Sequence, residues 1–216
     1  PDKMCLVINE KYEVLKNSAL YGQFMFDEFT AKEFFSKNGY WANKWAVQLG
    51  FRGSDLFAVK RLNYLAEFNT ARPYTYAHFD RISNYANYNQ ALAHPFGANF
   101  REFLGIMNYS LGRFDFQGQL VYARYGLDVE GTNFGKDIFK SYNNREAEYG
   151  NSIGQGLATN LYLANAKAAY MLNPKYNLKL ELGILLRRES NALARNETGL
   201  ITFGLRSSFR NLYQDF

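Results

Sequence analysis

Residues 114–126 read FDFQGQLVYARYG, a stretch in which apolar and polar side chains largely alternate. One face of an extended chain would carry mostly apolar residues, namely Phe114, Phe116, Gly118, Leu120 and Tyr122. The positions between them include Asp115, Gln117 and Gln119. A period of two is typical of a β-strand whose two faces meet different surroundings.

The same period recurs along the chain, for example in NKWAVQLGFRG at 43–53 and NLKLELGILLRRE at 177–189. From such stretches we predict nine strands, at 4–14, 18–29, 43–53, 56–70, 99–111, 114–126, 157–171, 176–189 and 198–213. Most are about 11 to 15 residues long, whereas strands of soluble proteins average about 5–6. A tilted strand needs about 9–11 residues to cross a bilayer, so strand length favours a membrane protein.

The connections between the predicted strands alternate between short and long. Short turns fall at 15–18, 53–55, 111–113 and 173–176, and each contains Gly, Asn, Asp or Pro. The other connections are the long segments 30–42, 71–98 and 127–156 and a shorter one at 190–197. This alternation is typical of outer-membrane barrels, which have brief periplasmic turns and long outer loops. We therefore predict an all-β fold, an antiparallel up-and-down transmembrane β-barrel in the bacterial outer membrane.

The predicted number of strands is odd. A bacterial single-chain barrel normally has an even number, so we expect further strands upstream of this sequence. Residues 1–216 are then a single barrel domain, the C-terminal portion of a larger barrel.

Composition excludes several other classes of protein. The net charge is +5, but 25 basic residues are offset by 20 acidic ones without a dense basic cluster, which argues against nucleic-acid binding. Cys5 is the only cysteine, so neither an internal disulfide nor a Cys-based zinc site is expected. No apolar run approaches the roughly 18 residues of a transmembrane helix. We predict no cofactor and no metal, because the carboxylates at 26–29 and 144–151 lack calcium-loop spacing.

Three stretches carry a resemblance to a known family: LKNSALYGQFMFDEF at 15–29, ARPYTYAHFDRISNYANYNQALAHPFGANFREF at 71–103 and FGLRSSFRNLYQDF at 203–216. The chain resembles the C-terminal part of Bacteroidota outer-membrane barrels of the capsule-assembly (Wzi-like) kind, which include a relative linked to gliding motility. The resemblance implies a monomeric barrel that holds or helps assemble surface polysaccharide and has no catalytic residues. Its expected partners are membrane lipid, lipopolysaccharide, surface polysaccharide and the barrel-insertion machinery.

The chain ends on an amphipathic stretch with an aromatic residue, Phe216, at its terminus. Such an ending resembles the signal that barrel-insertion machinery reads, so Phe216 is predicted to serve targeting. The alternative is the last edge strand of a soluble β-domain that ends in Phe.

The long connection 71–98 interleaves aromatic rings with amides and guanidinium groups. Aromatic faces stack on sugar rings, and amide and guanidinium donors bind hydroxyl or carboxylate groups. The predicted glycan-binding residues are Arg72, Tyr74, Tyr76, His78, Arg81, Tyr85, Tyr88 and Asn89. The alternative is that these aromatic residues pack the loop against itself.

Both histidines, His78 and His94, lie in this segment, with Asp80 and Ser83 close to His78. A Ser/His/Asp triad is recognised by geometry, and no nucleophile-elbow motif accompanies these residues. We therefore predict that the protein is not an enzyme. Two other functions remain open at this point, an outer-membrane pore and an outer-membrane hydrolase.

Alternation also predicts which side chains face the barrel interior. The polar positions of the strands are Gln48, Arg52, Arg61, Asn63, Glu67, Asn69, Asp115, Gln117, Gln119, Lys167, Lys179, Glu181 and Arg187. Their charges are of both signs and can pair across a narrow interior. We expect a filled barrel and not a general porin.

Overall fold

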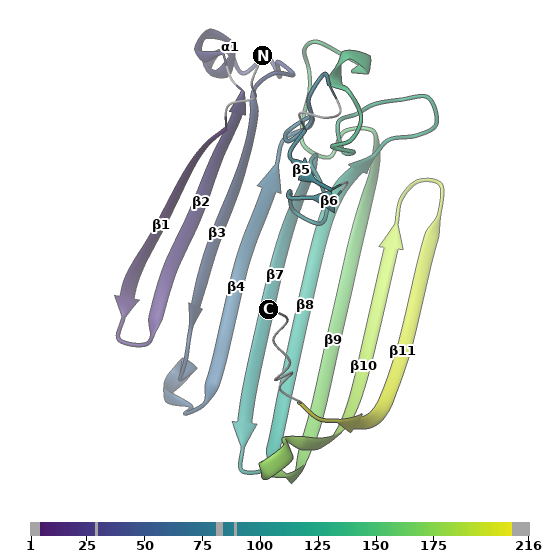
Figure 1. Ribbon diagram of the computed structural model, residues 1–216. Helices are drawn as coiled ribbons and strands as arrows, with labels where there is room; N and C mark the ends of the chain where they lie inside the picture. Colours follow the sequence, from purple (N-terminus) through teal and green to yellow (C-terminus); the bar gives the residue numbers. More distant parts are fainter. Residues whose placement is uncertain (1–4, 29, 81–83, 89, 209–216) are drawn as a thin grey trace, which may run out of the picture.

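The computed structural model describes residues 5–28, 30–80, 84–88 and 90–208. Nine long strands form one antiparallel sheet, and their order in the sheet follows their order in the sequence (Figure 1). They are β1 (Leu6–Leu15), β2 (Ser18–Glu28), β3 (Lys44–Gly53), β4 (Leu62–Ala71), β7 (Phe100–Leu111), β8 (Phe114–Leu127), β9 (Leu157–Asn173), β10 (Leu178–Ser190) and β11 (Arg195–Arg206). The all-β prediction and the nine-strand meander are thereby confirmed.

The sheet is open, since its two edge strands do not meet: among the described residues, β1 pairs only with β2 and β11 pairs only with β10. The remaining regular structure is slight. A short helix, α1 (Ala31–Ser36), precedes β3, and β5 (Ala86–Asn87) and β6 (Gln90–Ala91) form a small separate hairpin. Within the described ranges, no helix is both long and apolar enough to span a bilayer.

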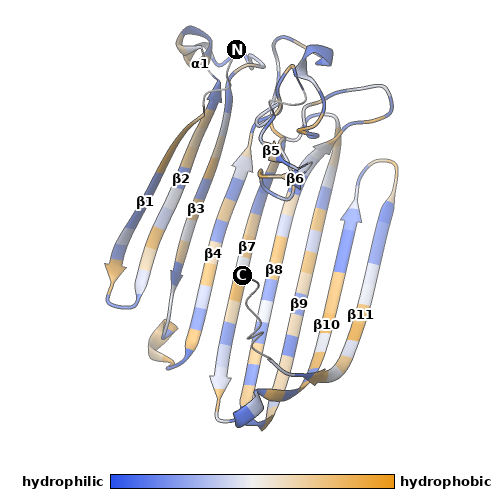
Figure 2. Ribbon diagram, viewed as in Figure 1, coloured by the Kyte–Doolittle hydropathy of each residue, from blue (hydrophilic) through white to orange (hydrophobic). Residues whose placement is uncertain are grey.

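Cross-strand register divides the sheet into two chemically different faces. Residues directly opposite one another share a face, and Leu49, Phe68 and Phe103 are aligned in this way across β3, β4 and β7. Gln48, one residue earlier, is aligned with Asn69 on the other face. Figure 2 shows the resulting alternation of hydrophilic and hydrophobic positions along β4, β7, β8 and β9. We call the two sides the apolar face and the polar face.

The polar face carries the residues that alternation assigned to it, with one exception. The exception is Arg61, which precedes β4 and lies in the connection 54–61. Ion pairs join strands on this face. Lys167 on β9 pairs with Glu181 on the neighbouring β10 at 3.6 Å, and Lys179 on β10 reaches across β9 to Asp115 on β8 at 2.6 Å. Charges of opposite sign are thus paired along the face.

The connection between β3 and β4 is longer than predicted. A turn at 53–55 and a strand from residue 56 were expected, but β4 begins at Leu62. The Asp55 carboxylate accepts hydrogen bonds from the Arg61 backbone NH, at 2.8 Å, and from the Asn17 side chain, at 3.1 Å. In the segment between Asp55 and Arg61, Phe57 and Ala58 have left-handed backbone, with φ of 54° and 62°. The predicted strand wrongly included Leu56 and Phe57 because both residues are apolar. Apolar character does not reveal the hydrogen bonds that the Asp55 carboxylate accepts.

The last hairpin is tighter than predicted. β11 begins at Arg195, so the connection after β10 spans only 191–194. The Asn191 side-chain oxygen accepts hydrogen bonds from the backbone NH groups of Leu193 and Ala194, both at 2.9 Å. The predicted final residues of this strand, 209–213, and the predicted targeting residue Phe216 lie outside the described residues.

Candidate functional site

Three long connections, 30–43, 72–99 and 128–156, gather at one end of the sheet, and we call them together the loop cap (Figure 1). Backbone hydrogen bonds join them. Trp41 NH donates to Glu148 O at 3.0 Å, and Ala98 NH donates to Lys136 O at 3.1 Å. Because segments distant in sequence bond to one another, the cap is an ordered unit.

The loop cap packs against the polar face. Its residues Tyr76, Ala98 and Ile138 share one buried cluster with strand residues of that face, including Met25 and Phe100. Since the main buried cluster lies here, the cap and the polar face stabilise each other. The apolar face takes no part in this cluster.

Three of the predicted glycan-binding residues are buried within the cap. Tyr74 is 1 % exposed, and its hydroxyl donates to Asn133 O at 2.8 Å. His78 is 4 % exposed, and its Nδ1 accepts from the Asp80 backbone NH at 3.2 Å. Tyr76 is 7 % exposed. These rings pack the loop against itself, the alternative that the sequence left open, and Tyr76 in addition lines a cavity described below.

Arg72 is also engaged in holding the cap together. Its guanidinium donates to the backbone oxygens of Tyr40 and Asn151, each at 3.3 Å, and so connects the other two connections of the cap. Burial lowers the pKa of this guanidinium from its usual value. The side chain is a cross-link and offers little to a ligand.

The other predicted residues of this segment lie nearer the surface. Tyr85 is half-buried and stacks on Tyr76 with ring centroids 5.6 Å apart. Tyr88 is 94 % exposed at the tip of the β5–β6 hairpin. Arg81 and Asn89 lie outside the described residues.

Sequence reasoning did not single out Lys44, which is the most buried cation of the cap region. Its ammonium lies 2.8 Å from the Glu28 carboxylate and faces the Tyr142 ring at 4.1 Å and the Trp41 ring at 5.2 Å. A buried charge needs such partners, because leaving water is costly. Only long-range contacts assemble this cage, so no local pattern in the sequence could have indicated it.

A cavity of about 260 Å³ lies between the polar face and the loop cap, and we call it the cap cavity. Gln23, Gln48 and Asn69 line it from the sheet. Tyr76, Tyr85 and His94 line it from the cap. Amide groups beside aromatic rings are the combination that binds a sugar ring, through hydrogen bonds and stacking. The sequence placed Tyr76 and Tyr85 in such a site but could not predict the amides opposite them.

His94 belongs to a satisfied hydrogen-bond network. Its Nδ1 accepts from the Phe96 backbone NH at 3.2 Å, so in the neutral ring Nε2 carries the proton. Nε2 lies 3.0 Å from a Glu102 oxygen that also accepts from Asn69 at 2.9 Å. Both ring nitrogens of His94 thus have partners, and the ring orients these groups.

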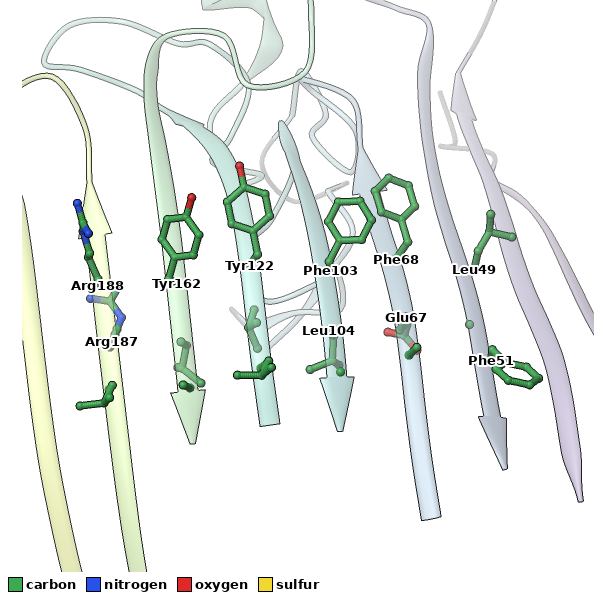
Figure 3. Close-up of a pocket in the computed structure, with 18 of the residues that line it drawn as sticks. Leu49, Phe51, Glu67, Phe68, Phe103, Leu104, Tyr122, Tyr162, Arg187 and Arg188 are labelled. Atoms are coloured by element: carbon green, nitrogen blue, oxygen red, sulfur yellow. The ribbon is translucent and has the colours of Figure 1, made fainter. Parts of the chain in front are cut away.

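The apolar face carries an aromatic row at the level of the loop cap, which we call the upper aromatic row. It comprises Phe68, Phe103, Tyr122 and Tyr162 on four neighbouring strands (Figure 3). Their consecutive ring centroids are 4.8, 6.5 and 4.9 Å apart. Residue alternation predicted that Tyr122 lies on the apolar side of its strand, but only the register shows that the four rings form a line.

A lower aromatic row lies near the short turns, formed by Tyr109, Phe116, Phe114 and Tyr170. The two rows are six to eight residues apart along β7 and β8, or about 20–27 Å of extended chain. Between them, the described residues of this face include no charged side chain. Leu120, between the rows, is 66 % exposed.

No metal centre is visible among the described residues, where no three His, Cys, Asp or Glu side chains come together. Comparison with known proteins gives no match: neither a protein-family model, nor a curated protein, nor a solved structure is similar to this chain. The candidate site therefore rests on its own geometry.

Proposed function

We propose that this chain is a section of a bacterial outer-membrane β-barrel that binds or helps assemble surface polysaccharide, of the capsule-assembly (Wzi-like) type. In this proposal the apolar face contacts lipid and the polar face lines the barrel interior. The loop cap stands at the outer surface and holds glycan in the cap cavity.

The observation that carries the membrane assignment is the charge-free apolar band between two aromatic rows. Outer-membrane barrels present to lipid an apolar band about 25 Å tall, flanked by aromatic girdles at both interfaces. The 20–27 Å between the two rows along the strands matches this height once strand tilt is allowed for. In water the same band would be an aggregation-prone patch, so lipid is the surrounding that fits it.

The cap cavity supports the polysaccharide assignment. Its volume, about 260 Å³, is below the roughly 300 Å³ at which pockets for drug-sized ligands begin, so it suits a single sugar ring. Gln48 supplies both a donor and an acceptor, and Tyr85 supplies a ring face. A chain end or a side-branch sugar is the group we expect here.

The lipid contact is tested with two single-Trp variants of the full-length protein, Leu120→Trp and Gln119→Trp, in which Trp41 and Trp45 are replaced by Phe. The two positions are adjacent on β8 but face opposite sides of the sheet. In bilayers of brominated phospholipid we expect strong quenching of fluorescence at position 120 and little at 119. Equal quenching at the two positions contradicts the proposal.

The glycan site is tested by binding of the full-length protein to a glycan array and to isolated surface polysaccharide. We expect Gln48→Leu combined with Tyr85→Leu to weaken binding at least tenfold, since about 1.4 kcal/mol corresponds to one hydrogen bond or stacked ring lost. Gln119→Leu, on the same face of the sheet but outside the cap cavity, is the matched control. Unchanged binding by the double variant rules out the cavity.

A further inference from the structure

Two arginines stand side by side on the apolar face, immediately above the upper aromatic row. Arg101 on β7 and Arg124 on β8 are directly opposite in register, and both are exposed. Within the described residues neither side chain forms an ion pair. Like charges in directly opposed positions repel each other, so this pair is unfavourable unless an anion lies between the two guanidinium groups.

The neighbours of the pair do not supply that anion. Thr70 flanks Arg101 and Asn160 flanks Arg124, and both residues are neutral. The Thr70 hydroxyl donates to Phe100 O at 2.8 Å. On the Asn160 side of the pair, the nearest carboxylate of this face in the strands is that of Glu197 on β11. Glu197 lies three strands from Arg124, a separation of at least about 14 Å. Glu197 is also engaged by Arg195 and Arg188.

Below the arginines the apolar face is hollowed. Phe103 and Tyr122 are the next residues of this face toward the short turns on the two strands (Figure 3). Below them passes a hollow of about 1310 Å³ that runs across the sheet, from Tyr12 on β1 to Gly199 on β11. Small residues floor it, among them Gly105 and Ala164. A Cβ added to Gly105 would meet no atom within 4 Å, so the hollow is open at this point.

We infer that Arg101 and Arg124 bind the phosphate of a phosphorylated lipid whose acyl chains lie in this hollow. The inference rests on the proposed membrane function, which sets the arginines at the level of the lipid headgroups. Guanidinium groups bind phosphate through paired hydrogen bonds, and two facing guanidinium groups can share one phosphate. The rings of Phe103 and Tyr122 cover the region between headgroup and chains, and the small residues leave room for the chains.

Native mass spectrometry of the full-length protein in detergent tests the site with three probes: dilauroyl phosphatidic acid, the diacylglycerol with the same chains, and inorganic phosphate. We expect the wild type to bind phosphatidic acid at least tenfold more tightly than either of the other probes. Arg101→Gln combined with Arg124→Gln should reduce this affinity to that for the diacylglycerol. Arg113→Gln, which removes an exposed arginine at the opposite rim of the sheet, should leave it unchanged.

A second variant tests the acyl part of the site without touching the charges. Gly105→Val places side-chain atoms in the hollow and should weaken binding of both lipids severalfold. Equal binding of phosphatidic acid by wild type and the double Arg variant overturns the inference. Equally tight binding of inorganic phosphate also overturns it, by indicating a site for a soluble anion. The brominated-lipid experiment separates a failure of this inference from a failure of the proposed function. If either result above overturns the inference while fluorescence at position 120 is quenched, only the inference fails. If fluorescence at position 120 is not quenched, the proposed membrane function fails as well.

Discussion

At the scale of single residues, the loop cap depends on neutral phenol groups held away from water. Burial, chiefly, raises the pKa of Tyr76 to about 12 from an ordinary value near 10, and Tyr85 and Asp27 add to this effect. The folded state therefore keeps a proton that the unfolded chain loses above about pH 10. The Tyr76 phenol therefore makes its full contribution to the free energy of unfolding below pH 10. That contribution, up to about 2.7 kcal/mol, is lost as the pH rises from 10 toward 12.

The corresponding prediction is an alkaline opening of the cap between about pH 10 and 12. The fluorescence of Trp41, which contacts Tyr142 and Tyr74, reports it, together with phenolate absorbance. Tyr76→Phe should move the transition to higher pH, because it removes the ionisable group and keeps the ring. Tyr88→Phe, at a 94 % exposed position, should leave it unchanged, and an identical shift in both variants would argue against burial as the cause.

At the scale of elements, alternation along a strand determines whether each side chain lies on the apolar face or on the polar face. Ile184 lies on the apolar face midway between the aromatic rows, whereas its neighbour Leu185 lies on the polar face. We expect Ile184→Arg to lower the free energy of unfolding in lipid vesicles by about 2–4 kcal/mol, the cost of a charge at the bilayer midplane. Leu185→Arg should cost less, and equal losses in urea titrations would contradict the assignment of faces.

The strands show how far sequence reasoning reached. The period of two placed β8 within one residue of its bounds and assigned Gln48 and Asn69 to one face. It failed where side chains bond to the backbone, as Asp55 does before β4. It also could not assemble the cap cavity, because Gln48 and Tyr85 meet only through the packing of the cap on the sheet. Local pattern determined the elements, and long-range contacts determined the site.

At the scale of the whole molecule, the loop cap covers one end of the polar face. If that face lines a barrel, the cap obstructs the path through it. We expect the full-length protein to show no steady conductance in planar bilayers, and we expect deletion of residues 84–92, which contain the β5–β6 hairpin, to produce measurable channels. Large, stable conductance of the intact protein would favour the pore hypothesis over the polysaccharide-binding one.

The count of strands in the open sheet has a topological consequence. In a meander every strand reverses the direction of the one before, so the first and the ninth, β1 and β11, point the same way. Hydrogen bonds made directly between these two edges would be of the parallel kind, unlike every other pair in the sheet. If further strands close the gap between β1 and β11 and every neighbouring pair is antiparallel, the number of those strands must be odd.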